Sequence, residues 1–421
     1  MTEPREPPPA PAGEAQLGGG ISRGLVLLLA ATCGAAAANL YYAQPLLNTL
    51  GHALGVSNGT AGLLITISQL GYVLGLALLL PLGDLRERRG LISGTLMLTA
   101  AGMAVAALAP SFAVFGAAIG VVGITSVVAQ VVVAMSSSLS ADEERGRVVG
   151  TVMSGLLIGI LLARTVSGLI AAALGWRTVF WFAAAAMLSL SLTLRRALPR
   201  VPPTTDISYR GLLRSVVELI REEPVLRQRM LIGALDFGCF STLWTALSFL
   251  LSGAPYHYGN AVIGLFGLVG VVGAGAASMA GRLADRGRGG WATTATLLIM
   301  LVSWAVLALG KTSLAPLIVG IAVLDLGVQG LHISNQSAIY ALRPEARSRL
   351  TTAYMVAYFL GGAVASALAA SLYAGGGWEA VCALGGGTAL AALAVWLVTE
   401  AMAARSRRAR GRIGERLGAT E

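Results

Sequence analysis

The sequence predicts an all-α integral membrane protein with twelve transmembrane helices in two parallel six-helix repeats. Of its 421 residues 56% are hydrophobic and only 12% charged, and the mean hydropathy is +0.75. This composition excludes an ordinary soluble protein with one buried core. Apolar stretches long enough to cross a bilayer follow one another along the whole chain. Sequence landmarks also recur at a nearly constant offset, which predicts the repeat.

Each predicted helix needs about 20 mainly apolar residues, because an α-helix rises 1.5 Å per residue and a bilayer core is about 30 Å thick. Twelve stretches meet this requirement, at about 24–47, 60–82, 90–109, 112–138, 148–173, 178–195, 229–252, 261–282, 291–310, 314–341, 350–373 and 378–400.

The connections between these stretches are short, except for a polar, proline-containing linker in the middle of the chain. Within it, Tyr209 to Arg221 follow the amphipathic pattern of a helix that lies on the membrane surface. The leading segment is rich in Pro, Gly and Glu and cannot bury apolar surface, so we expect it to be disordered. The predicted segments are a cytoplasmic tail (1–22), a six-helix half (23–195), a cytoplasmic linker (196–228), a second six-helix half (229–402) and a basic cytoplasmic tail (403–421).

Basic residues predict the orientation of the helices. If both termini face the cytoplasm, 27 of the 30 Lys and Arg residues fall in cytoplasmic segments. Cytoplasmic loops of membrane proteins carry an excess of these residues, so this orientation is strongly favoured. The net charge of +10 therefore reflects topology and does not indicate a nucleic-acid partner. The basic C-terminal tail is expected to contact anionic lipid of the bilayer.

The two predicted halves share landmarks. Asp84 and Asp285 are 201 residues apart, and Trp176 and Trp378 are 202 apart. Glu144–Arg147 precedes Ala346–Arg349 by 202 residues, and His52 precedes His257 by 205. A shared offset is typical of a duplicated unit. Both units begin on the same side of the membrane, so the repeats are parallel.

A charged motif, Pro81-Leu-Gly-Asp-Leu-Arg-Glu-Arg-Arg-Gly90, closes the second apolar stretch. It resembles the loop between helices 2 and 3 of the major facilitator superfamily, whose pattern is Gly-x-x-x-Asp-Arg-x-Gly-Arg-Arg. The motif keeps the family's charged positions at Asp84, Arg88 and Arg89, and it departs from the pattern at Leu80, Leu85 and Glu87.

A second, shorter copy at the equivalent place of the other half keeps Gly281, Asp285 and Arg286. The resemblance implies a cytoplasmic gate formed by Asp84, Arg88, Asp285 and Arg286. In it, Asp84 would lie near the start of helix 11, around residues 347–351, where the helix dipole favours a carboxylate. The alternative is that the arginines of this motif only set the topology.

The segment Asn39-Leu-Tyr-Tyr-Ala-Gln-Pro45, with Ser334-Asn-Gln336 and Gly361-Gly362, resembles a bacterial branch of predicted efflux permeases in this superfamily. The resemblance implies a transporter of the bacterial cytoplasmic membrane that works as a monomer. It also implies that helices 1, 4, 7 and 10 line a central cavity.

Charged side chains inside a bilayer are costly and are by default candidates for function. Within the predicted spans these are Arg164, Asp236, Asp325 and His332. Helix 10 carries two of them on one narrow face, because spacings of 4, 3 and 4 connect Asp325, Gln329, His332 and Gln336. We expect this face to line a polar cavity; the alternative is a stripe that joins helices by hydrogen bonds.

Helix 4 repeats this pattern in the first half with Ser126, Gln130 and Ser137. In helix 1, Asn39 and Tyr42 lie one turn apart and are expected to contact substrate. An aromatic residue at this place can instead mark the membrane interface.

Asp236 in helix 7, with Trp244 two turns later, is expected to bind a proton or a cationic substrate. An ion pair or a capped helix end is equally compatible with the sequence.

Arg164 in helix 5 cannot lose its proton, so it must be paired or bind an anion. Asp325, at similar depth, is its expected partner. Drug and proton antiporters of the superfamily have a Gly-Pro element near this place, where this chain has Ala163-Arg164.

No phosphate-binding loop, nucleophile elbow or metal-spaced His and Cys occurs in the sequence, which predicts no enzyme activity, cofactor or metal. The expected function is proton-coupled export of a small organic compound by alternating access. The coupling groups are Asp325 or Asp236, with His332 and Arg164. Two alternatives remain open. One is a symporter or uniporter that imports a polar nutrient, and the other is a membrane sensor that does not transport.

Overall fold

The computed structural model describes residues 21–201, 208–270, 289–343 and 346–418, and all regular structure in these ranges is helical. The N-terminal group of elements comprises α1 (Arg23–Ala38), η1 (Gln44–Leu46), α2 (Leu47–Ala53), α3 (Asn58–Leu74), η2 (Gly75–Leu79), α4 (Leu82–Leu85), α5 (Arg88–Leu108), α6 (Phe112–Ser126), α7 (Val128–Ser138), α8 (Asp142–Leu174) and α9 (Trp176–Ala197).

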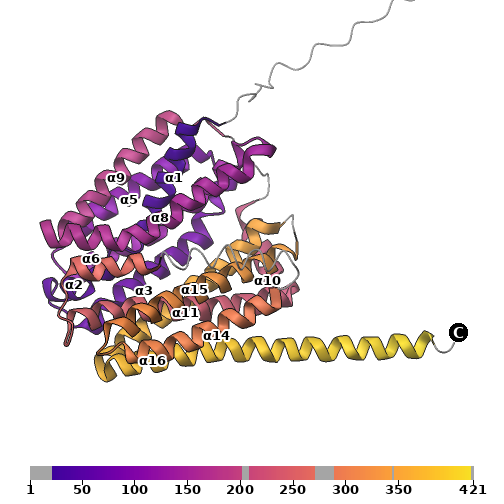
Figure 1. Cartoon of the computed structure of the whole chain (residues 1–421). Helices are drawn as coiled ribbons and strands as arrows, with labels where there is room; N and C mark the ends of the chain where they lie inside the picture. The colour runs from indigo at the N-terminus through magenta and orange to yellow at the C-terminus, as the bar shows by residue number, and fades with distance from the viewer. Residues whose placement is uncertain (1–20, 202–207, 271–288, 344–345, 419–421) are drawn as a thin grey trace, which may run out of the picture.

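The C-terminal group follows a connecting helix, and Figure 1 shows the two groups side by side. Its elements, after α10 (Tyr209–Glu222), are α11 (Pro224–Ser252), α12 (Asn260–Leu265), η3 (Phe266–Gly270), α14 (Gly289–Leu309), α15 (Leu314–Tyr340) and α16 (Arg347–Gly418).

Nine helices in the described ranges are long and apolar enough to cross a membrane. The number differs from the twelve predicted stretches at three places. The first stretch is broken into α1, turns and η1; of the eighth, only Asn260–Gly270 is described; and α16 contains two predicted stretches, which meet at the non-helical Gly377. The number of twelve spans therefore stays a prediction.

The first predicted stretch, 24–47, is not one helix, which corrects the sequence-based expectation. α1 ends at Ala38, turns follow, and the 3₁₀ segment η1 begins at Gln44. Pro45 explains the break, because proline has no backbone N–H and its ring obstructs the preceding helical turn. The break places Tyr41, Tyr42 and Gln44 in the protein interior, where all three are buried.

The two groups bend at equivalent positions. Gly175 (φ 85°) stands directly before Trp176, and Gly377 (φ 63°) stands directly before Trp378 inside α16. Positive φ angles favour glycine because it has no Cβ. Both tryptophans are buried, and Trp378 donates a hydrogen bond to the carbonyl of Leu307 at 2.8 Å. The repeat read from the sequence thus has a counterpart in the backbone.

Glycines let helices approach closely. A Cβ added to Gly155 or Gly159 in α8 would overlap the backbone of Ala30 or Gly34 in α1. The spacing of Gly155, Gly159 and Gly168 in α8, the fifth predicted helix, indicates such close packing, and the structure confirms it. Between the two groups, Gly168 of α8 lies equally close to Asn260 at the start of α12.

The two groups are joined mainly toward one end, which we call the outer end. It holds residues 54–57 and 253–259, which the charge pattern predicts to lie outside the cell. Apart from bonds made by the connecting helix α10, five side-chain hydrogen bonds connect the groups among the described residues. All five lie within about 17 Å of this end along the helix axes. They join Thr49 to Asn260, Thr66 to Ser366, Gln69 to Ser241, Thr165 to Gly264 and Ser248 to Pro45.

At the opposite, inner end, α10 is tied to the segment before α16. Arg343 forms ion pairs with Glu222 (2.9 Å) and Glu223 (2.8 Å). The hydrogen bond that Arg343 donates to Glu222 raises the pKa of the Arg343 guanidinium above its ordinary value. The amphipathic helix α10 is thereby held against the C-terminal group.

Candidate functional site

A buried arginine between the two groups forms the centre of the candidate site. Arg164 in α8 is 2% exposed, and its Nε donates a hydrogen bond of 2.7 Å to Oε1 of Gln44. Its guanidinium carbon lies 3.9 Å from the ring centroid of Trp244 in α11, 4.8 Å from Tyr41 and 5.5 Å from Phe240. Aromatic faces attract cations, and this attraction is strongest where water is excluded.

The expected ion pair between Arg164 and Asp325 is not formed in the described structure, which corrects that expectation. No nitrogen–oxygen pair of the two lies within 4.0 Å, although the two charges interact over a longer distance. Trp244 covers the guanidinium and also interacts with the Asp325 carboxyl without completing a hydrogen bond. Arg164 Nη2 and Asp325 Oδ1 are both buried and without hydrogen-bond partners.

A small, partly open space of about 10 Å³ lies beside the guanidinium, which is room for about one water molecule. It is lined by Gln44, Pro45, Arg164, Trp244, Leu247, Ser248 and Ile263, which belong to both groups. The site is therefore nearly closed in this conformation.

Asp236 in α11 is a second buried charge site, separate from the first. Its exposed fraction is 0%, and neither carboxyl oxygen has a hydrogen-bond partner. Its electrostatic neighbours are Tyr354, Tyr358 and Cys239. Neither alternative from the sequence is seen among the described residues, because Asp236 forms no ion pair and lies inside a helix of 29 residues. Burying an unpaired ionised carboxylate is very costly, so the geometry favours the protonated acid.

A polar chain lies next to Asp236. Nδ1 of His332 and Oη of Tyr354 are 3.1 Å apart, and Asn335 Nδ2 donates to the same hydroxyl at 3.4 Å. Arg229 Nη1 donates to Asn335 Oδ1 at 3.1 Å. The ring of His332 also lies 4.7 Å from that of Tyr358.

Sequence reasoning missed Arg229, Asn335 and Tyr354. Arg229 is the first residue of the predicted span 229–252, so it was assigned to the preceding loop and not to the membrane interior. Its spacing of seven residues to Asp236, which is two helical turns, was the available signal. Asn335 follows His332 by three residues and thus shares its side of the helix.

The predicted stripe on helix 10 divides between the two sites. Asp325 is 4% exposed and lies beside Trp244, whereas His332 lies near the inner end with Tyr354. Gln329 and Gln336 are half-buried and have no side-chain hydrogen bond in the described ranges.

The residues predicted from helices 1 and 4 pack inside the N-terminal group. Asn39 is 4% exposed and its Nδ2 lies 3.3 Å from the sulfur of Met187. Tyr42 is buried, and its carbonyl accepts a hydrogen bond from Ser167 at 2.6 Å. Gln130 Nε2 donates to Tyr72 Oη at 3.4 Å.

Of the predicted gate residues, only the side chain of Arg88 lies in the described part. Its Nε donates to the carbonyl of Gly83 at 2.9 Å and its Nη1 to Ser138 Oγ at 3.0 Å. These bonds tie the charged motif to the end of α7 in the same group. The Asp84 side chain, Asp285 and Arg286 lie outside the described residues.

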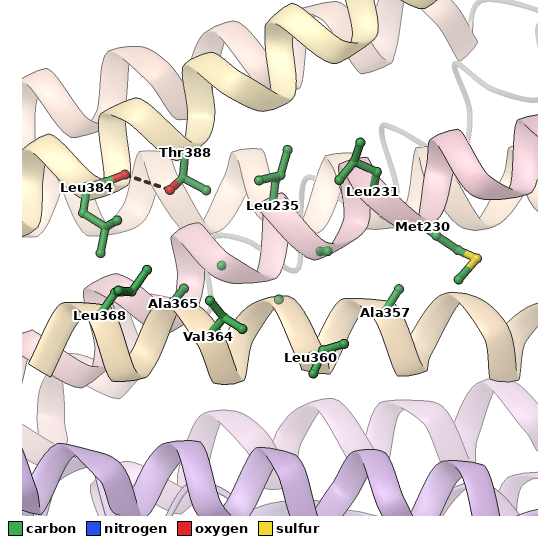
Figure 2. Close-up of a pocket in the computed structure, with 13 residues that line it drawn as sticks. Met230, Leu231, Leu235, Ala357, Leu360, Val364, Ala365, Leu368, Leu384 and Thr388 are labelled. Carbon is green, nitrogen blue, oxygen red and sulfur yellow. Dashed lines mark hydrogen bonds between the residues drawn. The ribbon is translucent and has the colours of Figure 1, made fainter.

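A larger groove of about 420 Å³ lies elsewhere, between α11 and both limbs of α16 (Figure 2). Its lining is almost entirely apolar, and the hydroxyl of its single polar side chain, Thr388, already donates to the carbonyl of Leu384 at 2.8 Å. Leu360 and Val364 at its rim are 44% and 55% exposed, as expected for a surface that faces lipid. None of the charged candidates lines this groove. Among the described residues, no His, Cys, Asp and Glu side chains gather as a metal site.

Comparisons with known proteins agree with a transporter. The family model described as "Major Facilitator Superfamily" matches residues 27–341. The chain is 47% identical over 376 residues to the "Uncharacterized transporter YgaY" of Escherichia coli O157:H7, covering 89% of this chain and 95% of that protein. It is 34% identical over 374 residues to the "Probable transporter SCO4007" of Streptomyces coelicolor, covering 87% and 86%. The "Chloramphenicol resistance protein" of Streptomyces lividans is 28% identical over 303 residues, covering 68% and 72%.

Solved structures share the fold at low sequence identity. A bacterial homolog of the human lysosomal transporter Spinster, in an inward-facing and occupied conformation, has a TM-score of 0.74 and 14% identity, covering 89% of this chain and 96% of that chain. The human organic anion transporter MFSD10 has a TM-score of 0.63 and 20% identity, covering 88% and 98%.

Proposed function

Because the chain belongs to the major facilitator superfamily and is a multi-pass membrane transporter, we propose that it exports a small organic compound in exchange for protons. In this proposal it has twelve spans in two halves of six, with the boundaries predicted from the sequence. It lies in the bacterial cytoplasmic membrane as a monomer with both termini in the cytoplasm. Transport proceeds by alternating access, and the chain carries out no enzymatic step.

The observation that carries the proton-coupled part is Asp236. It is fully buried, its two oxygens have no partner, and no cation pairs with it among the described residues. A carboxyl group in this setting holds a proton in one conformation and releases it when water or a cation reaches it. A group that binds protons differently in two conformations links proton movement to the conformational change.

The polar chain beside Asp236 supports a proton route toward the inner end. His332, Tyr354 and Asn335 are connected by hydrogen bonds, and Arg229 extends the chain toward the start of α11. Hydroxyl and imidazole groups both accept and donate protons. In this proposal His332 assists proton transfer, and its charge state depends on whether water enters from the inner end.

The distribution of contacts supports alternating access. The hydrogen bonds between the two groups lie in the outer half, so a substrate site near Arg164 and Asp325 would be closed on that side. Both residues lie about 15 to 17 Å from the outer ends of their helices, which is near the middle of a bilayer. In this proposal, the outward-facing state forms when these contacts open and the gate residues Asp84, Arg88, Asp285 and Arg286 close the inner end.

In this proposal the substrate contacts of the open state are Asn39, Tyr42, Gln130, Asp236, Trp244, Gln329, His332 and Gln336, and proton coupling involves Arg164, Asp325, Asp236 and His332. Similarity to a protein named for chloramphenicol resistance supports export as the direction. The same fold also serves import, so direction must be measured.

Proton movement in proteoliposomes tests this function. Liposomes that contain the protein and an internal pH dye are challenged with cationic, neutral and anionic compounds. We expect proton flux that starts on addition of a substrate and is lost in Asp236→Asn, but not in Glu218→Gln on the exposed face of α10. Flux of substrate without protons would leave a uniporter, and co-movement in one direction would identify a symporter. No flux of any compound would favour a sensor.

A further inference from the structure

Two buried charges of opposite sign lie at the boundary between the halves, and neither forms an ion pair among the described residues. Arg164 belongs to α8 in the N-terminal group, and Asp325 belongs to α15 in the C-terminal group. They are 2% and 4% exposed, and each has a buried polar atom, Nη2 or Oδ1, without a hydrogen-bond partner. An unsatisfied buried charge is expensive, so retaining both requires a compensating function.

Trp244 contacts both charges. Its ring covers the guanidinium at 3.9 Å and its side chain also interacts with the Asp325 carboxyl, although neither Trp244 Nε1 nor Asp325 Oδ1 has a hydrogen-bond partner among the described residues. Gln44 occupies the Nε side of Arg164 at 2.7 Å. Arg164 Nη2 and Asp325 Oδ1 therefore remain available, one on each half of the protein.

We propose, resting on the transport function above, that the substrate is amphoteric and carries an acidic group for Arg164 and an ammonium group for Asp325. A guanidinium binds carboxylate or phosphonate oxygens through parallel hydrogen bonds. A carboxylate binds an ammonium group in the same charge-assisted way. One substrate thus supplies both missing partners, and neither a simple cation nor a simple anion does so.

This substrate class fits exchange with protons. An ammonium group and a proton compete for the same carboxylate of Asp325, and such competition is what antiport requires. A substrate with only an acidic group would instead add negative charge near Asp325 and favour protonation of Asp325. Substrate and proton would then bind together and move in the same direction. The acidic group stays with Arg164, which remains charged throughout.

The aromatic surroundings indicate a further preference. Tyr41, Phe240 and Trp244 surround the guanidinium, and the small space beside it holds only about one water-sized group in this conformation. Substrate binding must therefore displace Trp244 or separate α8 from α11. Because the two charges lie on different halves, a bridging substrate favours the conformation that brings the halves together.

Matched derivatives test the proposal in the proteoliposomes described above. Each α-amino acid of a panel with aromatic and aliphatic side chains is compared with its methyl ester, which lacks the acid, and its N-acetyl form, which lacks the ammonium group. We expect flux of at least one free amino acid to exceed that of both derivatives by at least tenfold. Arg164→Gln should bring the ratio of free amino acid flux to methyl ester flux near one. Asp325→Asn should bring the ratio of free amino acid flux to N-acetyl amino acid flux near one.

Arg164→Lys keeps the charge and should retain part of the preference for the acid, whereas Arg214→Gln on the exposed face of α10 should change neither ratio. Equal flux of an ester or N-acetyl form, or flux of other compounds while no amino acid moves, would overturn the amphoteric substrate and leave proton-coupled transport intact. No flux of any compound would remove the transport function itself and this inference with it.

Discussion

The guanidinium of Arg164 lies 3.9 Å from the ring of Trp244, so a cation of the N-terminal half is covered by an aromatic side chain of the C-terminal half. Because Gln44 is its only hydrogen-bond partner among the described residues, the arginine depends on this contact for stabilisation. A desolvated cation–π contact contributes about 2 kcal/mol. The contact also joins the two halves near the middle of the bundle.

Replacement of Trp244 tests the contribution of that contact. We expect Trp244→Leu to lower the melting temperature in detergent and to reduce transport at least tenfold, since a buried cation loses its cover and a cavity forms. Trp244→Phe keeps an aromatic ring, so its losses of melting temperature and of transport should each be less than half of those in Trp244→Leu. The measurements are thermal unfolding and flux in proteoliposomes. Equal behaviour of the two variants would show that ring electrostatics contribute little.

Asp236→Asn should leave stability unchanged or slightly higher. The acid is buried without partners, and an amide of the same shape removes any cost of ionisation. Asp236→Ala, in contrast, leaves a cavity and should cost about 1 to 3 kcal/mol. Unfolding midpoints of both variants, measured at the same pH, decide the matter. Strong destabilisation by Asn would indicate that Asp236 is ionised and has a partner.

Two glycines of α8 provide a matched pair. A Cβ at Gly159 would overlap the backbone of Gly34, whereas at Gly150 it meets nothing within 4 Å. Gly159→Ala should therefore destabilise by about 1 to 3 kcal/mol through forced separation of α1 and α8. Gly150→Ala should be neutral or stabilising by up to about 1 kcal/mol, because alanine favours the helix. Thermal unfolding of both variants measures this difference, and a neutral Gly159→Ala would contradict the close packing.

A disulfide across the outer half should stop transport. The hydroxyl oxygens of Thr66 and Ser366 are 2.8 Å apart across the two groups. In a background without Cys33, Cys239 and Cys382, the pair Thr66→Cys and Ser366→Cys should crosslink on oxidation and reduce flux at least tenfold, because the outer half then cannot open. A reductant should restore flux. Each single cysteine variant is the control, and full flux in the crosslinked protein would exclude opening at this place.

The sequence by itself determined the membrane-spanning character and most helix positions. Long apolar runs and the period of 3.6 residues are local properties, so the stretches that became α5, α9, α14 and α15 could be placed within a few residues. The same reasoning selected Arg164, Asp236, Asp325 and His332, because a charge inside an apolar run is visible without any structure.

Only the tertiary structure decided what surrounds those charges. Arg164 faces Gln44 and three aromatic rings instead of Asp325. Asp236 has no hydrogen-bond partner in the described part of the chain, and His332 joins a chain with Tyr354, Asn335 and Arg229. Apart from Asn335, which shares α15 with His332, these neighbours lie in other elements than the charge they contact: Tyr41 in the turn after α1, Gln44 in η1, Arg229, Phe240 and Trp244 in α11, and Tyr354 in α16. Spacing along one helix fixes which side chains share a face. What that face meets depends on how helices distant in sequence pack together, and local periodicity does not encode that.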